Sequence, residues 1–456
     1  MLQLCGRCCI ALVLYVLMLP GTQAGQLAEL YERALGEDPR FLAARHEYDA
    51  QAQERPLARS AYLPSLDIVY ENIETEQDIV RSDNEVFGAG RSTFPTDNLI
   101  ISLRQPIFRY DLWQSMKRAK AVVQQAAQTL AAEEQELIFR VTERYLAVLA
   151  ANDGFDLALA EQLAIKENLE LVQARRAAGM ANRVDVYDAK ARAAVADVQV
   201  LEAENRQQDA LRALEETVGP VVLRREALQA TIGLTQPDPV DGQSWVDAAL
   251  AQNLRIAAAG QAVVAAQREV RVQRGARYPS LDLVVTDSDR DTGGTLFGGG
   301  SEVETQELLL RVQVPIYKGG AVNARVRRAL AELERARDEL ELLERQSERE
   351  ARGAHRNVVT GLSKVPSLLE SLEAQRSALE SKERGYEAGL NTALDILDAQ
   401  RDFYLTRGDY LQSRYDFLLD TLRLKRVAGI LNRGDLMAVD AMLVDAPASR
   451  SPVARD

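Results

Sequence analysis

The sequence contains an internal repeat of two copies, and this duplication constrains its fold more than any other feature. The segment Tyr-Leu-Pro-Ser-Leu-Asp at 62–67 returns as Arg-Tyr-Pro-Ser-Leu-Asp at 277–282. Three later landmarks return in the same order at nearly one offset of about 210 residues: 103–108 as 312–317, 178–189 as 388–399, and 218–219 as 428–429. The Pro- and Gly-rich segment 231–242 is typical of a linker. We therefore expect a first repeat at 25–230 and a second at 243–431.

Each copy predicts the same order of elements. A helix of about 30 residues (27–59; 245–273) is rich in good helix formers. Two short strands then alternate apolar with polar residues, and polar loops join them at 75–97 and 287–306. We expect these strands at about 65–73 and 98–105 in the first repeat, and at about 281–286 and 308–314 in the second.

A very long helical stretch follows the strands in each copy, at 112–178 and 321–388. Such a helix would be about 100 Å long at 1.5 Å per residue. Asn152–Gly154 and Pro366 should bend or pause it. Apolar residues recur at the spacing of a coiled-coil seam, as in Leu330, Leu333, Ala336 and Leu340. The chain should reverse at Gly179 and Gly389, and shorter helices should return at 185–216 and 395–427.

The strands pose a physical problem, because one face of each hairpin is too apolar for water. Alternation of apolar with polar side chains is typical of a membrane β-barrel wall. Four strands cannot close a barrel, and an open sheet edge cannot lie in hydrocarbon, so closure would require several subunits. A soluble antiparallel sheet would give the same alternation, and the strand pattern alone favours it. The signal peptide and the long helices shift the balance toward the membrane wall.

The N-terminus predicts export. Residues 1–24 contain one basic residue, an apolar run over 10–19 and a small-residue end, as a secretory signal peptide does. That run is about half the ~20 residues of a membrane-spanning helix, so we expect cleavage near Ala24. All three cysteines (Cys5, Cys8, Cys9) lie inside this segment, so the mature chain should lack thiols.

The residue inventory argues against catalysis. The net charge is −13, which disfavours nucleic acid as a partner. The two histidines, His46 and His355, lie far apart in charged helical stretches, whereas a catalytic base needs positioned partners. We expect no enzymatic activity, no cofactor and no metal.

Two sequence motifs resemble those of a known protein family. The chain resembles the TolC family of outer-membrane efflux and secretion proteins in two segments. One runs from Tyr386 through Gly389 to Leu-Asp-Ile-Leu-Asp-Ala at 394–399, and the other is Val-Pro-Ile-Tyr at 314–317. The resemblance covers about 27–431. It implies a mainly α fold with membrane β structure: a homotrimer with a 12-stranded barrel in the outer membrane, continued through the periplasm by an α-helical barrel. It also implies a periplasmic adaptor and an inner-membrane pump or ABC transporter as partners, and outer-membrane lipid around the strands.

The resemblance also implies a gate. Asp395 and Asp398 match the carboxylates that constrict the periplasmic entrance in the family. Tyr386 matches the family's gate tyrosine, and Asp185 matches the family's hydrogen-bonding acid in the first repeat. Residues at i and i+3 share one helix face, so a trimer would present a ring of carboxylates that prefers cations and responds to pH. The sequence departs from the family twice: Asn391 stands where some members carry a basic residue, and Asp188 adds an acid. Arg183 could supply the missing cation, or it could be a solvated charge.

The two turns are expected to be docking tips for the adaptor, formed by Gly179, Met180, Gly389 and Leu390. A periplasmic adaptor or coiled-coil scaffold is the main alternative, although such adaptors have one helical hairpin and do not duplicate it. Residues 432–456 match nothing in the family pattern and are expected to form a loose tail.

Overall fold

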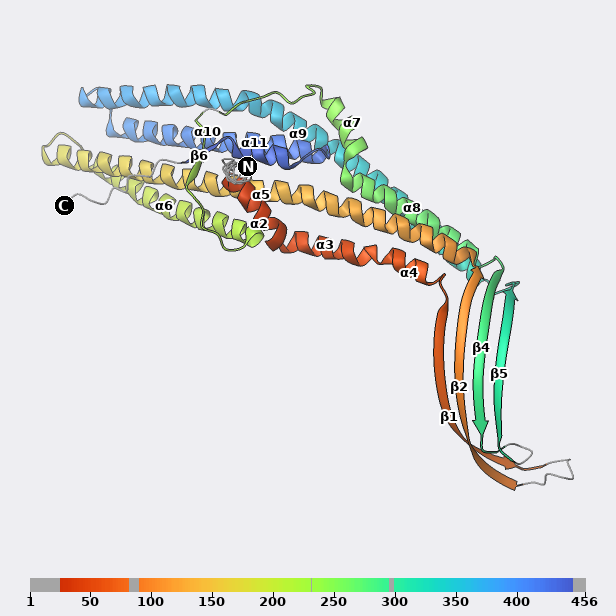
Figure 1. Cartoon of the computed structure of the whole chain (residues 1–456). Coiled ribbons are helices and arrows are strands. Elements are labelled where there is room, and N and C mark those ends of the chain that lie inside the picture. Colours follow the sequence, from red (N-terminus) through yellow and green to blue (C-terminus); the bar gives the residue numbers. More distant parts are fainter. Residues whose placement is uncertain (1–24, 82–89, 231, 295–298, 446–456) are drawn as a thin grey trace, which may run out of the picture. The chain divides into compact units, whose positions relative to one another are not determined.

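The computed structural model describes residues 25–81, 90–230, 232–294 and 299–445 (Figure 1). The expected signal peptide therefore lies outside the described residues. The chain forms two compact units. The sheet unit comprises His46–Gln128 and Ala257–Leu342, and the helical unit comprises Met1–Arg45, Thr129–Ile256 and Leu343–Asp456. Each unit takes segments from both repeats.

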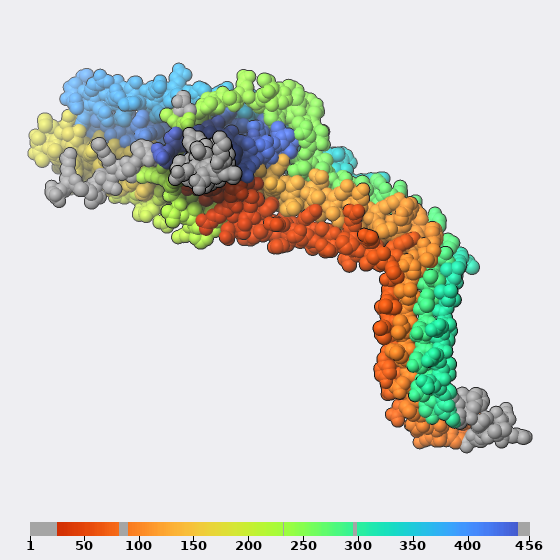
Figure 2. Space-filling model, in the orientation of Figure 1, coloured from red at the N-terminus to blue at the C-terminus, as the bar shows by residue number. Residues whose placement is uncertain are grey.

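The sheet unit contains one antiparallel four-stranded sheet in the order β1-β2-β4-β5. Its strands are β1 (Ser65–Ile79), β2 (Gly90–Phe108), β4 (Ser280–Thr292) and β5 (Ser301–Gln313). Each predicted hairpin is thus present, and the two hairpins pair through β2 and β4, with Leu103 opposite Val285. Figure 2 shows the four strands side by side in chain-colour order.

The register gathers apolar side chains on one face of this sheet. Residues opposite each other across a ladder share a face. Leu66 lies opposite Leu103, which lies opposite Val285, which lies opposite Leu308. The resulting apolar band has members from all four strands: Leu66, Ile68, Tyr70, Leu99, Ile101, Leu103, Leu281, Leu283, Val285, Leu308, Leu310 and Val312.

The strands are longer than their apolar pattern. Beyond the band, the side chains on the same face become polar, as in Asn72 opposite Asp97 and Asp291 opposite Glu302. The backbone ladder continues regardless, because its hydrogen bonds do not depend on side-chain polarity. Most of the two segments expected to be loops, 75–97 and 287–306, is therefore strand where the structure describes it.

The initial helix of each repeat is broken where a single helix was expected. The first repeat has α2 (Gln26–Glu37), α3 (Pro39–Ala52) and α4 (Glu54–Ser60), and the second has α7 (Gly242–Gln252) and α8 (Leu254–Gly275). Asp38 and Asn253 are extended at the two equivalent breaks. Each side chain accepts a hydrogen bond from the amide two residues on, Arg40 or Arg255, and so caps the following helix.

Four long helices follow: α5 (Tyr110–Ala177), α6 (Arg183–Val218), α9 (Ala321–Glu387) and α10 (Ala393–Val427). Helix α5 continues through Gly154 and α9 through Pro366, so neither predicted interruption ends its helix. Within the sheet unit, Leu333, Ala336 and Leu340 of the predicted seam pack with Val263 and Val270 of α8. Leu330 is exposed, and its neighbour Ala329 is buried in its place.

The core of the helical unit lies where α2, α5, α10 and α11 (Arg433–Asp440) meet. Two tyrosines are fully buried there, and each hydroxyl donates to a carboxylate. Tyr145 bonds Glu226 at 2.5 Å, and Tyr415 bonds Asp153 at 2.7 Å. A buried hydroxyl needs such a partner, so these pairs fix the packing of the tyrosines.

The expected loose tail is wrong for the residues that the structure describes. Helix α11 buries Leu436 and Val439 in the core. Strand β6 (Leu443–Asp445) pairs antiparallel with β3 (Glu226–Leu228). Two short elements carry little periodic signal, and their stability comes from contacts with distant parts of the chain.

Candidate functional site

The two predicted reversals have the same backbone geometry. Gly179 and Gly389 both adopt φ +77°, a region that glycine adopts more readily than other residues. The amide that follows each glycine donates back to the last helical turn, from Met180 at 2.8 Å and from Leu390 at 2.7 Å. This is a Schellman ending, which closes a helix and starts a tight turn.

Both turns expose apolar side chains. Met180 is 71 % exposed and Leu390 is 83 % exposed. The two tips, coloured yellow and blue in Figure 2, lie at the same end of the helical unit. A contact joins them directly, since Arg175 of the first tip donates to the carbonyl of Tyr386 in the second at 3.2 Å.

Asp185 and Asp395 occupy equivalent places in the two repeats, as N3 residues of capping boxes. Asp185 accepts from the Asn182 amide at 3.0 Å. Asp395 accepts from both the amide and the hydroxyl of Thr392, at 2.8 and 2.7 Å. These hydrogen bonds stabilise the charged carboxylate and lower the pKa of Asp395 from its ordinary value. Both acids thus begin a helix, a role that the resemblance did not predict.

Asp398 lies one helical turn beyond Asp395 and has a cationic partner. Arg192 of α6 donates to its carboxylate at 2.5 Å. The equivalent acid of the first repeat, Asp188, has no hydrogen bond or ion pair within the part of the chain that the structure describes. The two repeats therefore differ at this position.

Tyr386 is 7 % exposed and packs against Val172 and Ile396. The guanidinium of Arg175 lies over its ring, 3.9 Å from the centroid. A cation at this distance is attracted by the ring face. Arg175 thus holds Tyr386 by its ring as well as by its carbonyl.

Arg183, which was considered as the missing cation of the gate, bonds a tyrosine. Its guanidinium donates to the hydroxyl of Tyr187, at 3.0 and 3.3 Å. Two cations that the structure brings into direct contact with predicted gate residues are Arg175 and Arg192. Neither stood out in the sequence, because both lie in ordinary helical surroundings and their partners are about 200 residues away.

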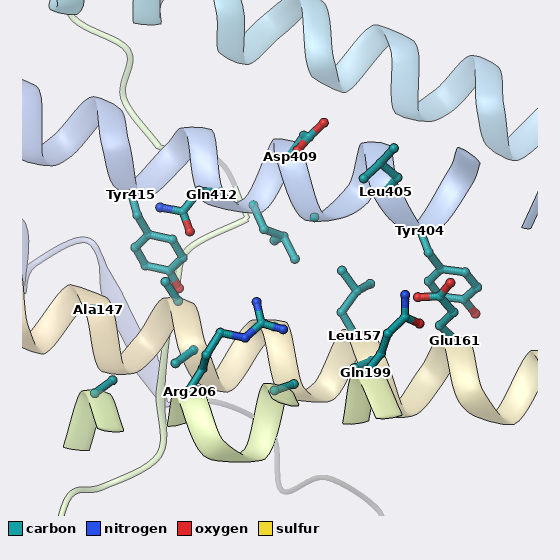
Figure 3. A pocket seen from close by; sticks show the side chains of 18 of the residues that line it. Ala147, Leu157, Glu161, Gln199, Arg206, Tyr404, Leu405, Asp409, Gln412 and Tyr415 are labelled. Carbon is teal, nitrogen blue, oxygen red and sulfur yellow. The ribbon is translucent and has the colours of Figure 1, made fainter. Parts of the chain in front are cut away.

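A groove of about 740 Å³ runs between α5, α6 and α10 further from the tips (Figure 3). Small residues of α5, including Ala147, form part of its lining, and Arg206, Glu161 and Asp409 add charges. Burial raises the pKa of Glu161. The groove contains none of the predicted gate residues.

No cluster of metal-ligating side chains occurs among the residues with described coordinates. Within the same residues, no helix has both the length and the apolarity to cross a membrane. His355 lies 2.9 Å from the carbonyl oxygen of Val240 at Nε2, a contact that suits a structural role.

The chain matches the family described as "Outer membrane efflux protein" over residues 30–220 and 245–430. The two matched segments correspond to the two repeats. The alkaline protease secretion protein AprF of Pseudomonas aeruginosa is 28% identical over 93% of this chain and 89% of its own length. The outer membrane protein TolC of Vibrio cholerae is 27% identical, over 92% of this chain and 94% of its own.

Solved structures show the same fold. The outer-membrane channel OprN aligns with a TM-score of 0.76 at 19% identity, over 88% of this chain and 89% of that chain. The open state of the MtrE outer membrane channel of Neisseria gonorrhoeae aligns with a TM-score of 0.68 at 18% identity, over 90% of each chain. By the match over both repeats, this chain belongs to the outer membrane efflux protein family, a family of channels.

Proposed function

We propose that three copies of this chain form one outer-membrane exit duct that carries protein cargo out of the cell. Twelve strands would close a barrel in the membrane, and the long helices would continue it through the periplasm. The observation that carries the proposal is the apolar band of the sheet. Leu308, Leu310 and Val312 are 75, 61 and 64 % exposed in the single chain.

Such a band requires an apolar surrounding. An exposed apolar surface of this kind marks a membrane or protein contact. The opposite face carries Asp67, Ser102, Thr286 and Glu307 across the four strands, as a water-filled lumen would need. The sheet ends at β1 and β5, and open edges are not tolerated in hydrocarbon. Pairing β1 of one copy with β5 of the next would remove them.

The relatives favour protein as the cargo. AprF and the proteases secretion protein PrtF of Dickeya chrysanthemi match 93% and 96% of this chain. The outer membrane efflux protein BepC of Brucella suis matches 75% of it. A secretion duct needs no catalytic group, since its work is to provide a wet path, and we propose that this chain catalyses no reaction.

We further propose that the gate lies at the tips. Asp395, Asp398 and Tyr386 of the second repeat would narrow the lumen, with Asp185, Asp188 and Arg183 of the first beside them. Arg192 and Arg175 would hold this region closed in place of the basic residue absent at Asn391. Met180 and Leu390, next to Gly179 and Gly389, would contact a periplasmic adaptor that links the duct to an inner-membrane ABC transporter.

Deletion of the gene that encodes this chain in its host tests the proposed function as an exit duct. We expect the deletion strain to retain an exported protease inside the cell while its drug susceptibility stays unchanged. Outer-membrane fractions of the wild type should contain heat-modifiable trimers. Normal protease secretion together with raised drug susceptibility would show an efflux duct, and absence of the trimer from outer-membrane fractions would contradict the duct itself.

A further inference from the structure

Gly25, which precedes the first helix, lies against a carboxylate from the other end of the chain. A Cβ atom at position 25 would overlap both carboxylate oxygens of Asp440 in α11, so this position requires glycine. A backbone nitrogen is about 2.5 Å from the Cβ position of its own residue. The Gly25 nitrogen therefore lies within about 4.5 Å of Oδ2 of Asp440.

The Asp440 carboxylate is already bound to the start of α2. Its Oδ1 accepts a hydrogen bond from the Leu27 amide at 3.1 Å, and the Ala28 amide donates to the same carboxylate. Burial nevertheless raises the pKa of Asp440 above its ordinary value, because a half-buried carboxylate loses hydration. A positive charge beside it would stabilise the ionised form.

The surroundings of Asp440 contain more acidic than basic groups. Glu29 and Arg224 both act on it electrostatically. Arg224 lies 3.9 Å from Glu29 and 3.9 Å from Glu226, and the hydroxyl of Tyr145 donates to Glu226. Three carboxylates thus share one guanidinium. Asp440 itself makes no ion pair with another side chain in the part of the chain that the structure describes.

Removal of the signal peptide would supply the missing positive charge. Gly25 directly follows the small-residue end Thr-Gln-Ala at 22–24, which is typical of a cleavage site. We infer that a signal peptidase cleaves the chain between Ala24 and Gly25, and that the new α-ammonium group of Gly25 forms an ion pair with Asp440. Water hydrolyses the amide: the C–N bond breaks, the hydroxyl goes to the Ala24 carbonyl carbon, and the nitrogen of Gly25 takes up the protons.

The pair solves an electrostatic problem at the start of α2. An ammonium group at the N-terminus of a helix lies at the positive end of the helix dipole, which is unfavourable. The carboxylate of Asp440 offsets that repulsion. Gln26 and Leu27 are only 4 and 0 % exposed, so a peptidase could reach the bond before α2 folds and not afterwards. Cleavage would therefore precede the docking of α2 on α11.

The inference goes beyond the proposed duct and does not depend on it. It requires export of the chain, and it applies to the helical unit of a single copy. It also assigns a role to α11, whose Asp440 would hold the first residue of the mature chain.

The mature protein, purified from outer membranes, allows a direct test. Its amino-terminal peptide, identified by mass spectrometry, should begin at Gly25. An amine-selective acylating reagent, applied over a range of pH, then measures the titration midpoint of the α-amino group on that peptide. The ordinary pKa of this group is about 8. We expect the native protein to titrate higher and to be labelled about tenfold more slowly at pH 7, as one pH unit implies.

Two variants separate the ion pair from burial. Asp440→Asn keeps an acceptor for the Leu27 amide and should return the midpoint to its ordinary value. Glu32→Gln is the matched control, because it breaks the 2.5 Å pair with Arg433 that joins the same two helices, and it should leave the midpoint raised.

A mature chain that begins at any other residue would overturn the inference. Equal midpoints in the wild type and Asp440→Asn would overturn it as well, since the raised value would then come from another group. If Asp440→Asn fails to fold, the wild type is labelled both in its native state and in denaturant. Equal midpoints in those two states would exclude the ion pair.

Discussion

Arg192 on α6 donates a hydrogen bond of 2.5 Å to the carboxylate of Asp398 on α10. The contact joins the two repeats beside their tips. Both side chains are partly exposed, at 28 and 40 %, and such pairs contribute at most about 1 kcal/mol to stability. The pair is thus well suited to a contact that breaks when a duct opens.

The first prediction removes this contact. Arg192→Ala should raise the single-channel conductance of the trimer in planar bilayers, because the two repeats separate more readily. The free energy of unfolding should change by less than about 1 kcal/mol. Arg206→Ala is the control, since that side chain donates to the Glu202 carbonyl of its own helix. Equal conductance in the two variants would rule out a latch at Arg192.

The second prediction concerns the carboxylates of the proposed gate. Replacing both Asp395 and Asp398 with asparagine should weaken block by a trivalent cation added from the periplasmic side, since the substitution would remove the proposed ring of negative charge. Asparagine is preferred to alanine here, because it keeps an acceptor for the Thr392 amide that Asp395 binds. Bilayer conductance measures the block. The same blocking concentration in wild type and variant would remove these residues from the constriction.

The third prediction is a pH dependence at the start of α10. Hydrogen bonds from Thr392 lower the pKa of Asp395 in the folded chain. A lowered carboxyl pKa contributes stability that is present above the unfolded pKa of about 4 and is lost as pH falls through the folded value. Amide protection factors of residues 393–396, measured by hydrogen exchange, should therefore fall in acid. Asp395→Asn should abolish this fall, and parallel profiles for the two proteins would contradict the cap.

The fourth prediction places the apolar band in lipid. Ile101→Arg should impair assembly into outer-membrane trimers, at a cost of about 2–4 kcal/mol if the residue lies near the bilayer midplane. Ile100→Arg is a matched control, because it pairs with Val69 and Ser288 on the opposite face. Trimer yield in membrane fractions distinguishes them. Equal yields would argue that neither face contacts lipid.

The fifth prediction tests a docking tip. Gly389→Val should abolish export and adaptor co-purification while trimers persist, since a β-branched residue disfavours φ +77° and should displace Leu390. Gly389→Asn should retain both, because asparagine tolerates this conformation. Normal export in the valine variant would place the docking surface elsewhere.

Several features follow from the sequence alone. The duplication determines that both halves of the chain repeat one order of elements, and the alternating residues around Leu66 and Leu308 determine where strands form. Gly179 and Gly389 mark the two reversals. Each of these signals is local, because residue spacing and backbone conformation act over a few neighbouring positions. For the same reason the family's sequence motif around Asp395 can be recognised without a structure.

Tertiary structure alone decided the pairings. Arg175 and Arg192 meet Tyr386 and Asp398 because two hairpins pack side by side, and no spacing in the sequence encodes that contact. The outer parts of the strands form although their side chains are polar, because a backbone ladder begun at the apolar band continues beyond it. Helix α11 and strand β6 are stable because distant segments bury Leu436 and pair with Leu443. Local patterns determine elements, whereas partners depend on which surfaces are left to cover once those elements pack.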